Sequence, residues 1–297
     1  MIRGSERITL STPSINERTE AGDRVSGERP SLPISAREVD ALHVAEELAR
    51  AAGALILDAA KLERPAENKG RTNLVTKTDH ASEALIIAGI EEAFPGHAIL
   101  SEESRPDTNW EHGYVWVIDP LDGTRNFVSG VPLYCVNIAL CLDGEAMLGV
   151  TYDPNREVCV TGGPGFGVRA NGKPVQASRA PDLASAVITA DLGYYDDRAR
   201  MMLDTVQAML PEMQAVRIIG SAALGLAWAA CGLSDLNMHS LLFPWDIGAG
   251  LATLPAGGGV LLDRDGGPAR LDSQGIVAGS PPIVAEFFER FSERPWR

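Results

Sequence analysis

One stretch of sequence, Asp119-Pro120-Leu121-Asp122-Gly123-Thr124, follows the apolar run 114–118 and governs how the surrounding chain is expected to fold. Pro120 disfavours helix at the residue before it, so we expect the run to be a strand that ends at Asp119. Gly123 can adopt backbone angles closed to other residues, and Thr124 can begin a helix. The stretch therefore predicts two carboxylates and a helix N-terminus at one place, which suits a phosphate together with a hard cation such as Mg²⁺.

The spacing of the two aspartates bears on the chemistry. Phosphatases that use a nucleophilic aspartate carry Asp-x-Asp-Gly-Thr, with one residue between the acids, whereas Pro120 and Leu121 both intervene here. An aspartyl-phosphate mechanism is therefore disfavoured. Outside the enzymes, the alternative is a protein that binds a phosphorylated metabolite without turning it over.

The segments before this stretch predict helices and short strands. A capping box at Ser35-Ala36-Arg37-Glu38 predicts a helix start, after which apolar residues recur at intervals of three and four through Leu55. The polar loop 66–72 leads to a second helical pattern over residues 80–94, with Asp79 at its N-cap. The run 97–100 is typical of a strand, and acids follow it in Ser101-Glu102-Glu103-Ser104.

The segments after the stretch predict two different sheets. Residues 133–175 consist of apolar runs broken by turn signals such as Asp143-Gly144, which predicts an antiparallel β-meander. Beyond Ala180 strand and helix patterns alternate, as in an α/β layer. We expect strands at 187–190, 215–219, 235–238 and near 260 and 277, with helices at 197–210, 221–231 and 246–254 and a closing helix.

The organisation of the chain follows from these patterns. Residues 1–34 are rich in Ser, Arg, Glu and Pro, and we expect them to form a disordered tail. Residues 35–180 are expected to form an N-terminal metal-binding α+β lobe, and residues 181–297 a C-terminal α/β lobe. A length of 297 residues is compatible with one large domain or with two lobes.

Composition excludes several classes of partner. The formal net charge of -14 repels polyanions, so we expect no nucleic-acid partner. No segment approaches the roughly 18 consecutive apolar residues that cross a bilayer, and we expect no membrane partner and a cytoplasmic location. The four cysteines are scattered without metal-site spacing, which predicts reduced core residues: Cys135, Cys141, Cys159 and Cys231.

Residues 116–127 resemble the first signature of the inositol monophosphatase family. Three other segments agree with the family's motifs in the same order: Leu74–Asp79, Ser101–Ser104, and Pro244–Gly250 followed by Gly257-Gly258-Gly259. The resemblance covers roughly residues 40 to 290. It implies an α/β fold, a layered αβαβα sandwich with an antiparallel N-terminal sheet and a mixed C-terminal sheet. It also implies Mg²⁺-dependent hydrolysis of a small phosphate monoester by metal-activated water, without a covalent intermediate.

The resemblance also implies roles for individual residues. Glu102, Asp119, Asp122, Asp246 and the carbonyl of Leu121 would be ligands of two or three Mg²⁺ ions. Asp79, Glu102 and Thr124 would be catalytic, with Asp79 and Thr124 positioning the attacking water. The substrate contacts would be Asp122, Gly123, Thr124, Ser221, Ala222, His239 and Asp246. Lys69 resembles a family lysine near the metals, and the family further implies inhibition by lithium and a homodimer.

The substrate stays open because of one departure from the family pattern. Relatives that act on inositol phosphate usually have a glutamate seven residues before the aspartate of the C-terminal motif, where this chain has His239. An imidazole can donate as well as accept hydrogen bonds, so it suits a different hydroxyl pattern or an anionic group. Relatives that cleave histidinol phosphate, fructose bisphosphate or 3′-phosphoadenosine nucleotides share the metal motifs. Asn126 slightly favours the inositol branch, and the acidic surface weighs a little against a nucleotide.

Overall fold

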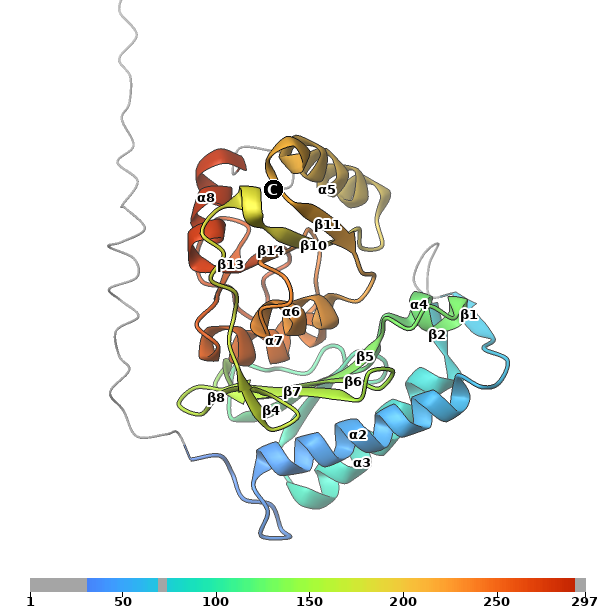
Figure 1. Cartoon of the computed structure of the whole chain (residues 1–297). Helices are drawn as coiled ribbons and strands as arrows, with labels where there is room; N and C mark the ends of the chain where they lie inside the picture. Colours follow the sequence, from blue (N-terminus) through green and yellow to red (C-terminus); the bar gives the residue numbers. More distant parts are fainter. Residues whose placement is uncertain (1–30, 69–73, 292–297) are drawn as a thin grey trace, which may run out of the picture.

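The protein is built from alternating layers of helices and sheets, as the computed structural model shows for residues 31–68 and 74–291 (Figure 1). The first layer, α2 (Ala41–Ala59) and α3 (Lys77–Ala93), covers one face of a seven-stranded sheet. The middle layer, α6 (Ala222–Ala230) and α7 (Pro244–Ala256), separates this sheet from a five-stranded one. The last layer consists of α5 (Asp196–Met209) and α8 (Pro281–Phe291). The predicted αβαβα sandwich is confirmed.

The seven-stranded sheet has its strands in chain order. They are β3 (Ala98–Ser101), β4 (Tyr114–Asp122), β5 (Cys135–Leu142), β6 (Glu145–Asp153), β7 (Val158–Gly163), β8 (Gly167–Ala170) and β9 (Lys173–Val175). From β4 onward all neighbours are antiparallel, so the predicted meander is confirmed. The prediction of a wholly antiparallel sheet is wrong at one edge, because β3 pairs with β4 in parallel. The connection 102–113 is long enough to return the chain to the same end of the sheet.

The five-stranded sheet is mixed, as predicted. Its strand order is β11 (Ala215–Ile218), β10 (Val187–Asp191), β12 (Leu236–His239), β14 (Ile276–Gly279) and β13 (Val260–Asp263). The first three strands are parallel to one another, whereas β14 is antiparallel to both its neighbours. The carboxyl ends of β10 and β12 therefore lie side by side, with Asp191 directly paired with His239.

The predicted start of the first helix is wrong. α2 begins at Ala41, and the Asp40 carboxylate caps it by accepting from the His43 N–H at 2.9 Å. Glu38 has a φ of 60°, which is incompatible with a right-handed helix, so the predicted capping box cannot open one. The Ser35 hydroxyl instead accepts from Val39 N in the turn that precedes the helix.

The predicted N-cap role of Asp79 is also wrong by three residues. Thr76 is the N-cap of α3, and Asp79 lies one turn inside, where its carboxylate accepts from the Thr76 N–H at 2.9 Å. The pair forms a capping box, in which an acid in the first turn binds the backbone of the cap residue. The predicted loop 66–72 begins as a strand, β1 (Ala66–Asn68), which pairs with β2 (Leu74–Thr76). Lys69 and most of the predicted tail lie outside the described residues.

Two other expectations concern the cysteines and membranes. All four cysteines are free thiols, three of them buried and Cys231 partly so. In the described ranges, none of the helices is both long and apolar enough to span a bilayer.

Glycines allow α7 to lie directly on the seven-stranded sheet. A Cβ placed on Gly149 of β6 would meet the Ala249 carbonyl oxygen at 2.3 Å and the Ala249 Cα at 2.6 Å. Both are backbone atoms, which cannot move aside as a side chain can. The closeness of this contact matters because α7 carries Asp246, so any lift of the helix would move that carboxylate away from the sheet.

We predict that Gly149→Ala lowers the free energy of unfolding by roughly 3 kcal/mol or more, because the added methyl must push α7 off the sheet. Gly89→Ala in α3 is the matched control. Its Cβ would also meet an atom at 2.3 Å, but that atom is the flexible end of Leu48, and alanine favours the helix by about 1 kcal/mol. Denaturant unfolding of both variants checks this; equal effects of the two would contradict it.

Candidate functional site

Three carboxylates from two distant parts of the sequence come together at the carboxyl end of β4. Oxygen atoms of Asp119, Asp122 and Asp246 all lie within 4.8 Å of one another. The side chains of Asp119 and Asp122 are almost wholly buried, with exposed fractions of 2% and 7%. An all-oxygen, acidic donor set of this kind is what a hard divalent cation such as Mg²⁺ prefers.

An irregularity in β4 brings the side chains of its two aspartates close together. Side chains three residues apart in a regular strand point to opposite faces. The β4–β5 register shifts between Asp119, which pairs with Asn137, and Asp122, which pairs with Cys135. Asp119 Oδ1 also accepts from the Leu121 N–H at 3.0 Å, which folds the backbone around Pro120. The bulge thus redirects Asp122 towards Asp119.

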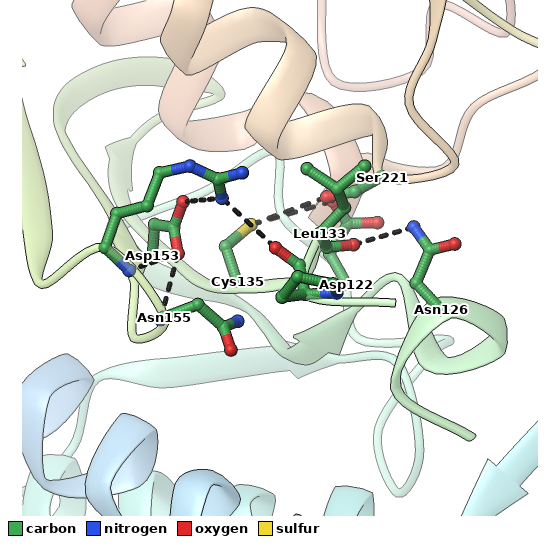
Figure 2. A network of polar contacts seen from close by, with 9 residues as sticks. Asp122, Asn126, Leu133, Cys135, Asp153, Asn155 and Ser221 are labelled. Carbon is green, nitrogen blue, oxygen red and sulfur yellow. Dashed lines mark hydrogen bonds and ion pairs between the residues drawn. The ribbon is translucent and has the colours of Figure 1, made fainter. Parts of the chain in front are cut away.

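Asp122 is held by the start of α6, as Figure 2 shows from close by. Its Oδ2 accepts from the Ser221 hydroxyl at 2.5 Å and from Ala223 N at 2.8 Å, and Ala222 N lies 3.3 Å from Oδ1. The thiol of Cys135 lies 3.7 Å from Oδ2. A carboxylate at a helix N-terminus satisfies N–H groups that would otherwise lack partners. These bonds join the start of α6, in the middle layer, to the Asp122 carboxylate of the seven-stranded sheet.

Asp246 is held through Asn137 as well as through its own helix. Its Oδ2 accepts from Phe243 N at 2.7 Å in the first turn of α7. The Asn137 amide on β5, which is 1% exposed, donates to the Trp245 carbonyl at 2.8 Å and accepts from the Thr151 hydroxyl at 2.7 Å. Since Asn137 is paired with Asp119 across the sheet, one buried amide links the positions of Asp119 and Asp246.

Asp79 and Thr124 meet beside this cluster. The Thr124 hydroxyl, in the first turn of α4 (Thr124–Ser129), lies 2.9 Å from Asp79 Oδ1 and 3.1 Å from the Leu121 carbonyl oxygen. Gly123, which precedes α4, has a φ of 94°, as the sequence predicted, and a Cβ there would meet the Leu133 carbonyl at 2.8 Å. Burial raises the pKa of Asp79, and its hydrogen bonds to Thr76 and Thr124 oppose that rise.

Glu102 lies outside the group of three but near it. The parallel pairing of β3 with β4 places it next to Ile118, whose carbonyl accepts the Glu102 N–H at 3.3 Å. A buried residue that the sequence reasoning missed, Glu83 of α3, fixes the turn around it. Glu83 Oε1 accepts from Glu103 N at 3.1 Å and from Ser104 N at 3.0 Å, and also from the Ser101 hydroxyl. Its position one helical turn after Asp79 is a signal that could have identified it.

The electrostatics of the cluster favour a bound cation. Burial raises the pKa of Asp119 well above its usual range, and the charges of Glu102, Asp122 and Asp246 raise it further. Burial likewise raises the pKa of Asp122 and Asp246, against hydrogen bonds that lower them. Buried carboxylates that repel one another are stable as anions only beside compensating positive charge. The residues present therefore fit a divalent metal.

A hollow beside the carboxylates contains most of the predicted substrate contacts. It is lined by Asp122, Gly123, Thr124, Ala222, His239 and Asp246, together with residues that sequence reasoning missed: Arg125, Asp191 and Tyr194. Ser221 is buried, and its hydroxyl is used by Asp122. Asp191 ends a strand of the α/β part, a position at which ligands commonly bind and which could have drawn attention to it. Nothing in the sequence pattern pointed to Tyr194, whose phenol pKa is raised by burial and by the nearby carboxylates.

Comparison with known proteins agrees with this geometry. The profile of the inositol monophosphatase family matches residues 38–293. The inositol monophosphatase of Dictyostelium discoideum is 36% identical over 234 residues, which are 77% of this chain and 86% of that protein. The Nus factor SuhB of Escherichia coli (strain K12) is 36% identical over 248 residues, which are 82% of this chain and 92% of that protein.

Solved structures are similar over most of the chain. The inositol monophosphatase from Anabaena (Nostoc) sp. PCC 7120 is 33% identical, with a TM-score of 0.76 over 86% of this chain and 96% of that one. SaIMPase-II has been solved with inositol monophosphate bound, at 25% identity and a TM-score of 0.72, and with 2′AMP bound, at 26% identity and 0.73. Both of these matches cover 84% of this chain and 93% of the other.

We predict that Asp119→Asn stabilises the metal-free protein at neutral pH. Asp119 has a raised pKa in the folded state. It therefore opposes folding once the pH rises above the pKa of an aspartate in the unfolded chain, about 3.9. Asparagine keeps the acceptor for Leu121 N but carries no charge. With a chelator present, the variant's melting temperature should be higher by a few degrees at pH 7.5, and the gain should shrink towards pH 4.

The matched control for this measurement is Asp153→Asn. Asp153 is also buried, but it binds Arg156 at 2.7 Å outside the cluster, so its variant should lose stability at pH 7.5. A metal-free Asp119→Asn protein that melts at or below the wild-type temperature would contradict the predicted repulsion within the cluster.

Proposed function

Because this chain belongs to the inositol monophosphatase family and is a phosphoric monoester hydrolase, we propose that it hydrolyses a small phosphate monoester with Mg²⁺ held by Asp119, Asp122 and Asp246. The main support for the proposal is that oxygen atoms of these three carboxylates lie within 4.8 Å of one another. We propose that the site holds two or three Mg²⁺ ions in all. We include Glu102 and the Leu121 carbonyl as further ligands of the metal. Glu102 supports this by lying close enough to raise the pKa of Asp119.

Bound Mg²⁺ would supply positive charge that activates water and stabilises the leaving oxygen of the ester. The protein's own residues orient the reactants. The Thr124 hydroxyl lies 2.9 Å from Asp79 Oδ1, and Thr124 lines the hollow, so we assign this pair to hold the attacking water. Gly123 and Thr124 line the same hollow, and we assign them with Asp122 to contact the phosphate.

We propose a small phosphorylated alcohol as the substrate. SaIMPase-II, which shares the fold, binds inositol monophosphate and 2′AMP, so a neutral polyol and a nucleoside both fit sites of this type. Inositol monophosphate is the first candidate, with histidinol phosphate, fructose 1,6-bisphosphate and 3′-phosphoadenosine nucleotides as alternatives. The net charge of -14 supports a small metabolite rather than a nucleic acid, although a relative in E. coli is named a Nus factor. By analogy with the family, we also propose a homodimer.

We predict that Asp119→Asn reduces Mg²⁺-dependent phosphate release by about 100-fold or more, because the site loses charge that holds the metal. Colorimetric phosphate release from inositol monophosphate measures this, with Asp153→Asn as the buried control outside the cluster. We expect lithium to inhibit the wild type in the same assay. Full activity of Asp119→Asn would refute the site assignment, whereas trapping of an acyl phosphate would indicate the covalent mechanism.

We predict that His239 selects the alcohol part of the substrate. His239 lines the hollow and is buried, and its Nδ1 accepts from Leu241 N at 3.2 Å, so the proton of the neutral ring lies on Nε2, a donor. His239→Glu replaces that donor with an acceptor. In a screen of inositol, histidinol, sugar and nucleotide monophosphates, the variant should shift towards inositol phosphate.

The control for this screen is His43→Glu, since His43 is exposed on α2. An unchanged ranking of substrates in His239→Glu, with activity retained, would show that this residue does not contact the alcohol part.

A further inference from the structure

Arg125 brings a positive charge to an otherwise acidic hollow. It lies in the first turn of α4, and it is the only lysine or arginine among the residues that line the hollow in the described part of the chain. The same lining contains three carboxylates, those of Asp122, Asp191 and Asp246. The chain as a whole has a net charge of -14, so its average surface potential repels anions.

Two contacts hold the guanidinium in place, and neither cancels its charge. Arg125 Nη2 donates to the Gly193 carbonyl at 2.9 Å, and Cζ lies 5.0 Å from the centroid of the Tyr194 ring. Within residues 31–68 and 74–291, no ion pair joins Arg125 to a carboxylate. A carbonyl and an aromatic face orient a cation without neutralising it. Partly buried charges in proteins usually have a charged partner.

The guanidinium also has unused hydrogen-bond capacity. It carries five N–H donors in a planar fork, of which the bond to Gly193 takes one. Such a fork matches the two oxygens of a carboxylate or phosphate. His239, which lines the same hollow, adds the Nε2–H donor. Asp191 accepts from Leu192 N at 2.7 Å and from Gly193 N at 3.4 Å. Its negative charge is therefore partly compensated by backbone N–H groups of the residues that follow β10.

We propose that Arg125 binds a second anionic group, a carboxylate or a phosphate, on the alcohol part of the substrate. The preferred substrates are then phosphate monoesters that carry a further negative charge. This inference rests on the proposed function and narrows its substrate class. It differs from a role in binding the phosphate that is cleaved, because that role would serve every substrate equally.

The test compares matched substrates in wild type and Arg125→Gln. Glycerol 3-phosphate and 3-phosphoglycerate differ by a carboxylate, and fructose 6-phosphate and fructose 1,6-bisphosphate differ by a phosphate. Wild type should favour the more anionic member of at least one pair, and the pair that shows it identifies the group. Loss of a charge-assisted bond should raise KM for that member about tenfold or more in Arg125→Gln. KM for its less anionic counterpart, which lacks the second group, should change less than about twofold.

Arg64→Gln is the matched control. Arg64 also contacts α4 through a carbonyl and a ring, since Nη1 donates to Phe127 O at 2.6 Å and Cζ lies 5.1 Å from the Phe127 centroid. It does not line the hollow. This variant should lose stability without changing the ratio of KM values within a pair, which separates a defect in α4 from a lost anion contact.

Two results would overturn the inference: no preference for either anionic member in wild type, or equal losses on both members of a pair in Arg125→Gln. If wild type with Mg²⁺ hydrolyses none of the four compounds and no other monoester, the proposed function fails instead. Calorimetric binding of the same four compounds then decides the inference by itself. Tighter binding of an anionic member that Arg125→Gln abolishes supports it, and equal binding contradicts it.

Discussion

Mutual repulsion of three carboxylates, two buried and one half-buried, is the constraint around which this structure is arranged. Asp119, Asp122 and Asp246 lie within 4.8 Å of one another, and burial and neighbouring charge raise the pKa of Asp119. A protein keeps such a group together only if other interactions hold each member in place. The bonds around the cluster do this: the start of α6 holds Asp122, the Phe243 backbone holds Asp246, and the Leu121 backbone holds Asp119. A bound divalent cation would relieve the remaining repulsion.

The layered fold is what makes this arrangement possible. The middle helices lie between the two sheets, so α7 can present Asp246 to the end of β4 while α6 presents its first N–H groups to Asp122 (Figure 1). Gly149 brings the α7 backbone against the sheet, and Asn137 ties its first turn to β5. The hollow that results is bounded on one side by the ends of β10 and β12, which supply Asp191 and His239. In the proposed function, the reacting end and the specificity end of the site thus come from different layers.

Much of this could be predicted from sequence because it depends on local patterns. The β-meander, the alternation of strands and helices after Ala180, and the glycine with positive φ at Gly123 all follow from periodicity and turn chemistry, and all are present. Motif order then associated Asp119 and Asp122 with Asp246, which no local pattern could do. The errors are also local: Glu38 has a positive φ that sequence does not reveal, and Asp79 is inside its helix because Thr76 was available as the cap.

The rest depends on contacts between residues far apart in sequence. The parallel pairing of β3, the bulge that redirects Asp122, and the convergence of Arg125, Asp191 and Tyr194 on one hollow are set by packing of layers. Anomalous diffraction from crystals soaked in Mn²⁺ shows whether the three carboxylates hold a divalent metal. We predict an anomalous peak about 2.1 Å from oxygens of Asp119, Asp122 and Asp246. A map with manganese bound elsewhere and none touching these three side chains would contradict it.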